Sequence, residues 1–183
     1  SGRYDLPFLF MSYFNIAFAY RQEASGGRGG ADGVAGFVAA SAAAGASGLI
    51  LPDLPPDMVR EGYKEACDKA ALHPVYVVSP NTGKERLEVI AEAGSGLLYA
   101  TSRTGTTGKE MDLEMDELTG FLASARETCG MPIAVGFSIS TREQVESLRG
   151  HADIAVVGTH FIRTWQEGGV EALAAELNKL TGS

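Results

Sequence analysis

Six short apolar segments, separated by polar stretches, set the pattern of this chain. They are rich in residues that favour strands, and they lie at residues 8–14, 49–53, 75–79, 97–101, 132–136 and 154–158. Most are continuous apolar runs and do not alternate with polar residues. Such runs are typical of parallel strands that are buried on both faces.

Helical patterns fill the intervals between these segments. Residues 57–71 carry apolar positions at a spacing near that of a helix. Two capping-box signatures predict further helix starts, Thr82 with Glu85 and Ser140 with Glu143. The repeat of strand and helix predicts an α/β barrel or an open α/β sheet. Residues 21–33, which are rich in glycine and charge, are interpreted as a flexible surface insertion.

Composition narrows the class of protein. The chain has 183 residues, a net charge of -8 and 45% hydrophobic residues, which predicts one packed domain over residues 1–183. An acidic chain is a poor partner for nucleic acid, although backbone amides can still bind a small phosphate. No leader or membrane-length apolar run is seen, and the two cysteines are read as reduced thiols. We therefore expect a cytoplasmic protein.

Three consecutive predicted strands are each followed by glycine and hydroxyl residues. These junctions lie at Ser102–Gly108, Gly136–Ser138 and Gly158–Thr159. The carboxyl ends of parallel strands meet at one rim of a barrel, where such loops hold phosphate. The sequence therefore predicts a phosphate site built largely from backbone N–H groups.

Other chemistry-bearing residues give weaker signals. The three histidines have no metal-ligand spacing, so no metal site is expected. The stretch Gly105–Lys109 lacks the first glycine of a nucleotide-binding P-loop and has Glu110 where that loop needs a hydroxyl. Trp165, at helical spacing from neighbouring apolar residues, is interpreted as a core residue.

Five stretches, taken together and in order, resemble the alpha subunit of tryptophan synthase. They are Met11–Asn15 with Phe18–Tyr20, Gly48–Pro56, Ser102–Gly108, Val135–Thr141 and Val156–Thr159. The resemblance, which runs from about residue 7 to the end, implies a TIM (β/α)8-type barrel with about six of the eight β-α units in this chain. It also implies a lyase that cleaves indole-3-glycerol phosphate to indole and glyceraldehyde 3-phosphate by a retro-aldol step. Indole then passes to a beta subunit that carries pyridoxal phosphate, so this chain itself is expected to hold no cofactor.

The resemblance also assigns roles to individual residues. The phosphate of the substrate is held at Gly108, Ser138, Gly158 and Thr159. The substrate pocket or its closing lid involves Tyr99, Arg103, Thr107 and Phe137. The interface with the beta subunit involves Asn15, Asp53, Pro55 and Pro56.

Two features depart from the family pattern. Ser138 stands where the family usually has glycine, and Thr159-His160 stands where it usually has serine-alanine. Both catalytic carboxylates of the family lie upstream of the residues that this chain matches. No residue here is therefore assigned a catalytic role, and this chain alone is expected to bind substrate with little turnover.

Alternatives remain open at this point. Asp53, which ends a strand, is a candidate substitute acid or base, or it caps the turn that follows it. The chain could be a non-catalytic module that binds a phosphorylated ligand or activates a beta subunit, or a different phosphate-binding barrel such as a sugar-phosphate isomerase. The segments 8–14 and 154–158 are expected to be exposed strand edges that pair with another chain.

Overall fold

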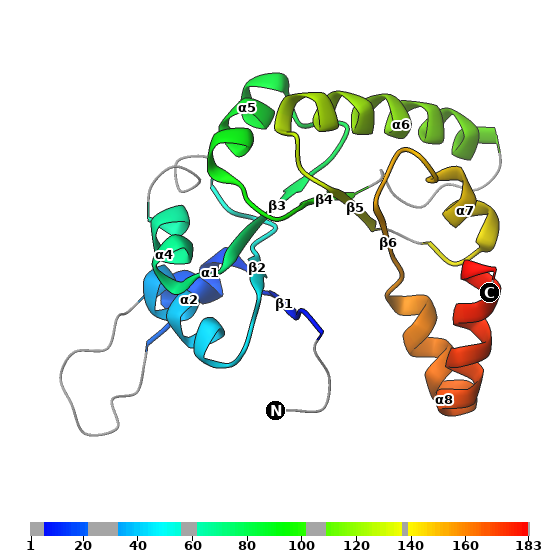
Figure 1. The fold of residues 1–183 in the computed structure, drawn as a ribbon, viewed down its shortest axis with the longest axis horizontal. Coiled ribbons are helices and arrows are strands. Elements are labelled where there is room, and N and C mark those ends of the chain that lie inside the picture. The colour runs from blue at the N-terminus through cyan, green and yellow to red at the C-terminus, as the bar shows by residue number, and fades with distance from the viewer. Residues whose placement is uncertain (1–5, 22–32, 56–61, 102–108, 137–138, 183) are drawn as a thin grey trace. The chain divides into compact units, whose positions relative to one another are not determined.

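The computed structural model describes residues 6–21, 33–55, 62–101, 109–136 and 139–182. It forms two compact units (Figure 1), each considered by itself. Unit 1 comprises Ser1–Val77 and Lys84–Leu97, and unit 2 comprises Val78–Gly83 and Leu98–Ser183. Most of the predicted insertion at 21–33 lies outside the described residues, so its flexibility stays a prediction.

Unit 1 is built on three parallel strands with helices between them. The strands are β1 (Leu9–Met11), β2 (Gly48–Ile50) and β3 (His73–Val78). The helices are α1 (Phe14–Ala19), α2 (Gly33–Ala43), α4 (Tyr63–Ala70) and α5 (Lys84–Ala93). Leu49 lies opposite Phe10 on one side and opposite Pro74 on the other. β2 is buried along its whole length, as its continuous apolar run predicts.

The residues around β2 are closely packed and buried. A Cβ atom at Gly48 would lie 2.8 Å from both the His73 carbonyl oxygen and the Leu9 side chain, so only glycine fits there. The Tyr63 hydroxyl donates a hydrogen bond to the Leu49 carbonyl oxygen at 2.7 Å and ties α4 to β2. Burial raises the pKa of the neighbouring Cys67 thiol to about 12, so this cysteine is a neutral core residue.

Unit 2 repeats the same design. Its strands are β4 (Leu98–Thr101), β5 (Ile133–Gly136) and β6 (Ile154–Val156), all parallel. Its helices are α6 (Lys109–Cys129), α7 (Arg142–Ser147) and α8 (Thr159–Thr181). Val135 lies opposite Ala100 of β4 and Ala155 of β6. Leu98 of β4, Ile133 of β5 and Leu122 of α6 have no exposed surface and belong to the core of unit 2.

Helix α8 consists of two helical segments. Gly169 interrupts it with φ 67° and ψ -157°, a conformation that other residues adopt only with strain. The two segments fold back on each other (Figure 1), and a contact between His160 and Glu176 joins them at 2.9 Å. The first turn of α8 is therefore held by the second segment.

All six predicted strands are present, but the predicted helix starts need correction. The capping box before α7 uses Thr141 and Gln144, one residue later than Ser140 and Glu143. The Gln144 side chain also accepts the Ser140 backbone N–H at 2.9 Å, so Ser140 lies before the cap. Before α5, the Thr82 hydroxyl accepts the Ser79 N–H at 2.9 Å instead of capping the helix.

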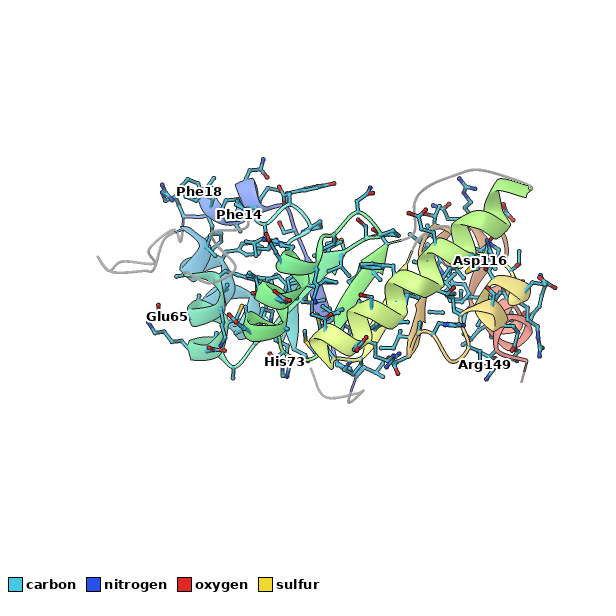
Figure 2. The ribbon with its side chains drawn as sticks, turned by 90° about the horizontal axis from the view of Figure 1, so that it is seen from above. Phe14, Phe18, Glu65, His73, Asp116 and Arg149 are labelled. Carbon is cyan, nitrogen blue, oxygen red and sulfur yellow. The ribbon has the colours of Figure 1, made fainter. Side chains whose placement is uncertain are left out.

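Several large apolar side chains lie on the surface. The prediction that Trp165 belongs to the core is wrong, since its side chain in α8 is 54% exposed. Both predicted edge strands carry exposed apolar residues, among them Met11 in β1 and Ile154 in β6. Figure 2 shows Phe14 and Phe18 side by side on α1, with ring centroids 5.9 Å apart. Within the described residues, β1 and β6 each pair with one strand only.

Candidate functional site

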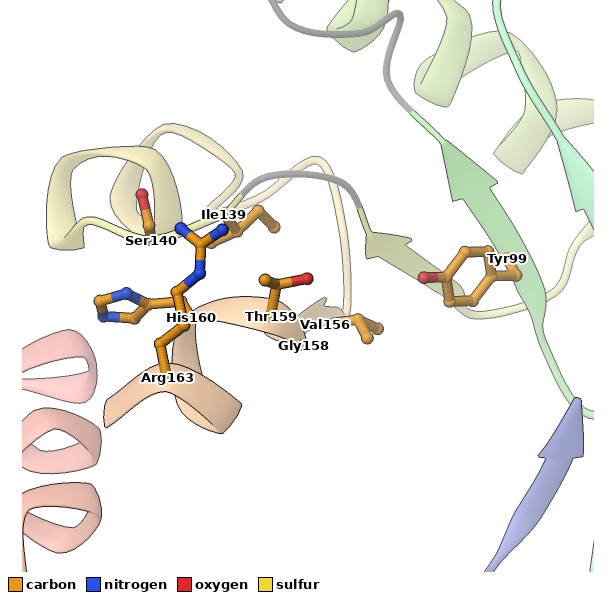
Figure 3. Close-up of a pocket in the computed structure, with 8 residues that line it drawn as sticks. All are labelled: Tyr99, Ile139, Ser140, Val156, Gly158, Thr159, His160 and Arg163. Carbon is orange, nitrogen blue, oxygen red and sulfur yellow. The ribbon is translucent and has the colours of Figure 1, made fainter. Parts of the chain in front are cut away.

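Unit 2 contains a cavity of about 620 Å³ where its strands end and α8 begins. Residues of β4, β6, α8 and the stretch after β5 surround it (Figure 3). Its lining residues are Tyr99, Ile139, Ser140, Val156, Gly158, Thr159, His160 and Arg163. The cavity therefore lies at the carboxyl ends of parallel strands, where the glycine and hydroxyl junctions predict a site.

The start of α8 supplies the part of the cavity suited to an anion. Thr159 is the first residue of the helix, and the Ile162 N–H donates to the Gly158 carbonyl oxygen at 3.2 Å as the first helical hydrogen bond. Backbone N–H groups that precede this bond have no partner within a helix. They carry the positive end of the helix dipole, and an anion can accept hydrogen bonds from them. Gly158 and Thr159 thus lie where the sequence predicts phosphate contacts.

Tyr99 forms another wall of the cavity. Its ring lies beside Gly136 of β5, where an added Cβ atom would overlap the phenol oxygen. The hydroxyl is directed toward Val156 (Figure 3). Partial burial raises the pKa of Tyr99, so the hydroxyl is neutral near pH 7 and can donate a hydrogen bond to a ligand.

A charged cluster supports the cavity from the second segment of α8. His160 Nε2 lies 2.9 Å from Glu176 Oε1, and Lys179 Nζ lies 3.2 Å from the same oxygen. The hydrogen bond with His160 lowers the pKa of the Glu176 carboxyl, with a smaller contribution from Lys179. This carboxylate is therefore ionised and already occupied at neutral pH. Among the lining residues that the structure describes, none carries a carboxylate.

In unit 1, the residues predicted for a subunit interface are engaged locally. Asp53 Oδ1 accepts the Phe14 N–H at 2.7 Å, so the carboxylate satisfies the first amide of α1. Asn15 Oδ1 accepts the Ile16 N–H at 2.9 Å. Asp53 thus caps a neighbouring helix, a role that the alternatives considered for it did not include. Pro55 is half-buried, and Pro56 lies outside the described residues.

The structure brings together some of the predicted site residues. Tyr99, Gly158 and Thr159 share the cavity, while their part in binding stays a prediction. The others assigned to the phosphate, the pocket or the lid lie outside the described residues: Arg103, Thr107, Gly108, Phe137 and Ser138. Arg163 was missed, although it follows Thr159 by four residues and a helix places such residues on one face. In the described part of the chain, no three His, Cys, Asp or Glu side chains gather as metal ligands would.

A family model described as "Tryptophan synthase alpha chain" matches residues 1–181. The chain belongs to this family. It is 40% identical to the tryptophan synthase alpha chain of Syntrophotalea carbinolica over 98% of its own length and 66% of that relative. It is 39% identical to the corresponding chain of Methanosarcina barkeri, covering 94% of itself and 62% of the relative.

Solved structures give the same result. A mutant tryptophan synthase alpha-subunit from the hyperthermophile Pyrococcus furiosus superposes with a TM-score of 0.76 at 32% identity, covering 97% of this chain and 67% of that one. The predicted fold class is thereby confirmed: this tryptophan synthase alpha chain family member has the TIM-barrel type of fold. It spans about two thirds of the length of its relatives. Among the helices described, none combines the length and apolar character that a membrane span requires.

Proposed function

We propose that this chain acts in the cleavage of indole-3-glycerol phosphate to indole and glyceraldehyde 3-phosphate, a lyase step of tryptophan biosynthesis. Its residues supply the phosphate half of the substrate site. The observation that supports this most strongly is the cavity at the start of α8, which Gly158, Thr159 and Tyr99 line. Membership of the tryptophan synthase alpha chain family supplies the reaction.

Each part of the proposed site would have a separate role in binding or cleaving the substrate. The first backbone N–H groups of α8 would bind the phosphate, together with Gly108 and Ser138. Tyr99 would line the pocket, and Phe137, Arg103 and Thr107 would complete the pocket and its lid. A retro-aldol cleavage also needs groups that transfer protons, each worth about 10²–10⁴ in rate. Asp53 is a poor substitute because its carboxylate already accepts the Phe14 N–H.

The proposed partner is a tryptophan synthase beta subunit, which would contribute pyridoxal phosphate and receive indole. Its contact surface on this chain would include Asn15, Asp53, Pro55 and Pro56. Asp53 and Asn15 each accept a backbone N–H at the start of α1 and hold it in place. This interface would therefore be partly preformed. We also propose the cytoplasmic location expected from the sequence; in the part of the chain that the structure describes, Cys67 and Cys129 form no disulfide.

Calorimetry and an indole-release assay together test the proposal. The 183-residue chain should bind sn-glycerol 3-phosphate, and it should release little indole from indole-3-glycerol phosphate with or without a beta subunit. Failure to bind the phosphate would overturn the proposed site. Turnover at the rate of a full-length alpha subunit would show that this chain already includes the proton-transfer groups.

A non-catalytic module is the second candidate. The backbone N–H groups at the start of α8 favour it, because they suit an anion whether or not a reaction follows. In that case the chain would bind sn-glycerol 3-phosphate without turnover and would raise the activity of an added beta subunit. No stimulation by the bound chain would exclude this second candidate.

We also infer that copies of this chain associate through their strand edges. Leu9 and Met11 of β1 and Ile154 of β6 expose 40%, 55% and 45% of their surface. An exposed parallel edge presents unpaired backbone groups and apolar side chains to another strand. Sedimentation velocity at increasing protein concentration tests this inference.

A further inference from the structure

Among the arginine and lysine side chains that the structure describes in unit 2, Arg163 is the one without a carboxylate partner. The described part of the unit contains five arginine or lysine side chains. Four of them contact a carboxylate: Arg126 with Asp153, Arg142 and Arg149 with Glu146, and Lys179 with Glu176. Arg163 makes no hydrogen bond or ion pair with any described residue, and it lines the cavity.

The position of Arg163 follows from the helix. It stands four residues after Thr159, and side chains at that spacing lie on the same helix face. Figure 3 shows its guanidinium group reaching up beside Ile139, on the same side of the cavity as His160. The guanidinium therefore extends the line of donors that the backbone N–H groups of α8 begin. An anion at the helix start would meet a full positive charge as well as the helix dipole.

The carboxylate that contacts the cavity-lining His160 is already engaged. Glu176 is engaged by His160 at 2.9 Å and by Lys179 at 3.2 Å. Within the described residues, no carboxylate pairs with the Arg163 guanidinium at the cavity, although the whole chain has a net charge of -8. A planar guanidinium can donate two parallel hydrogen bonds to one phosphate group, which an ammonium cannot do.

We propose that Arg163 is a specificity-determining residue of the phosphate site, and that it selects a phosphate monoester over a singly charged carboxylate. This inference rests on the proposed function and adds to it a residue and a ligand class. A phosphate monoester carries close to two negative charges at pH 7 and three acceptor oxygens. Backbone N–H groups alone would bind either anion, whereas the guanidinium adds a bidentate contact that favours the phosphate.

Titration calorimetry with sn-glycerol 3-phosphate and with glycerate tests this proposal on the 183-residue chain. Arg163→Gln should raise the dissociation constant for the phosphate by about tenfold or more, since it removes a charge-assisted contact. The affinity for glycerate should change less, and Arg163→Lys should fall between the wild type and Arg163→Gln. Arg149→Gln is the matched control, because it removes the same charge from an exposed arginine outside the cavity.

Each outcome separates the two proposals. A wild-type chain that binds no phosphate overturns the proposed function and this inference with it. Unchanged phosphate affinity in Arg163→Gln overturns the inference and leaves the proposed function standing. An equal loss in Arg149→Gln would show a general charge effect and would also overturn it. Thermal unfolding of Arg163→Gln should match the wild type, because the exposed side chain makes no hydrogen bond or ion pair with a described residue.

Discussion

Gly136 gives the Tyr99 ring the space that it occupies beside the cavity. An added Cβ atom would overlap the phenol oxygen and lie 2.6 Å from Tyr99 Cζ, so Gly136→Ala must displace the ring. Overpacking of this kind costs about 1–3 kcal/mol of unfolding free energy. Urea denaturation should show that loss, and phosphate affinity should fall with it.

Gly120 in α6 is the matched control for that substitution. No atom lies within 4 Å of a Cβ built there. Gly120→Ala should therefore stabilise the chain by about 0.5–1 kcal/mol, because alanine has the higher helix propensity. Equal stability of Gly136→Ala and the wild type, with unchanged affinity for sn-glycerol 3-phosphate, would contradict the packing argument at Tyr99.

The buried hydroxyl of Tyr63 carries a second prediction at this scale. It donates to the Leu49 carbonyl oxygen at 2.7 Å, and the side chain has no exposed surface. Tyr63→Phe removes this hydrogen bond to the carbonyl oxygen. Urea denaturation should show a loss of about 1–2 kcal/mol in the free energy of unfolding. The exposed Tyr13 provides the comparison, and Tyr13→Phe should leave the unfolding free energy unchanged.

At the scale of elements, the apolar runs predicted all six described strands, because such a run is a local feature of the sequence, although only β2 to β5 are largely buried. Helix starts were harder, since Ser140 with Glu143 and Thr141 with Gln144 fit the same capping signature. Backbone geometry decides between them: Thr141 is extended, with φ -125° and ψ 156°, and the helix begins at Arg142. Short signatures therefore place a helix start only to within a residue or so.

Substitutions at Thr141 and Ser140 test which of the two residues caps α7. Thr141→Ala removes the oxygen that accepts the Gln144 N–H at 3.3 Å and should cost about 1 kcal/mol of stability. Ser140→Ala should cost much less, because its hydroxyl makes only a long contact of 3.5 Å. Chemical denaturation of both variants tests the assignment. A larger loss of stability for Ser140→Ala than for Thr141→Ala would show that Ser140 is the capping residue, as predicted from sequence.

Asp153, just before β6, makes the stability of the fold depend on pH. Its carboxylate accepts the Ile133 N–H and an Arg126 N–H, both at 2.8 Å, and these bonds lower its pKa, the backbone bond most strongly. A lowered pKa in the folded state stabilises the fold above the unfolded value of about 3.9, and the gain is lost as pH falls through the folded value.

Asp153→Asn should therefore cost about 1 kcal/mol at neutral pH, a modest figure because the pair is partly exposed. The difference from the wild type should shrink as the pH falls below about 4. Urea denaturation at both pH values measures it. Glu171→Gln, at an exposed carboxylate of α8, is the control and should show no such convergence. A constant difference at all pH values would contradict the assignment.

At the scale of the whole molecule, the sequence predicted some of the residues that line the cavity, but not the charged side chains beside them. The glycine and hydroxyl junctions follow their strands directly, so the position of Gly158 and Thr159 could be predicted. The roles of His160 and Arg163 depend on how α8 folds back at Gly169 and on which carboxylates are already paired. Those facts arise from contacts between residues far apart in sequence. The wrong prediction for Trp165 has a similar cause, since helical spacing does not show which face of α8 is covered by other residues.

The exposed strand edges give the prediction that belongs to this scale. If copies pair through β1 and β6, sedimentation velocity should show larger species as concentration rises. Ile154→Lys should suppress them, because a lysine on an edge strand blocks pairing with another strand. Val170→Lys is the matched control, since Val170 is 73% exposed on α8 and lies outside every strand. A chain that stays monomeric throughout, or one whose association responds equally to both substitutions, would rule out pairing through these edges and would assign the apolar surface of β6 to a different partner.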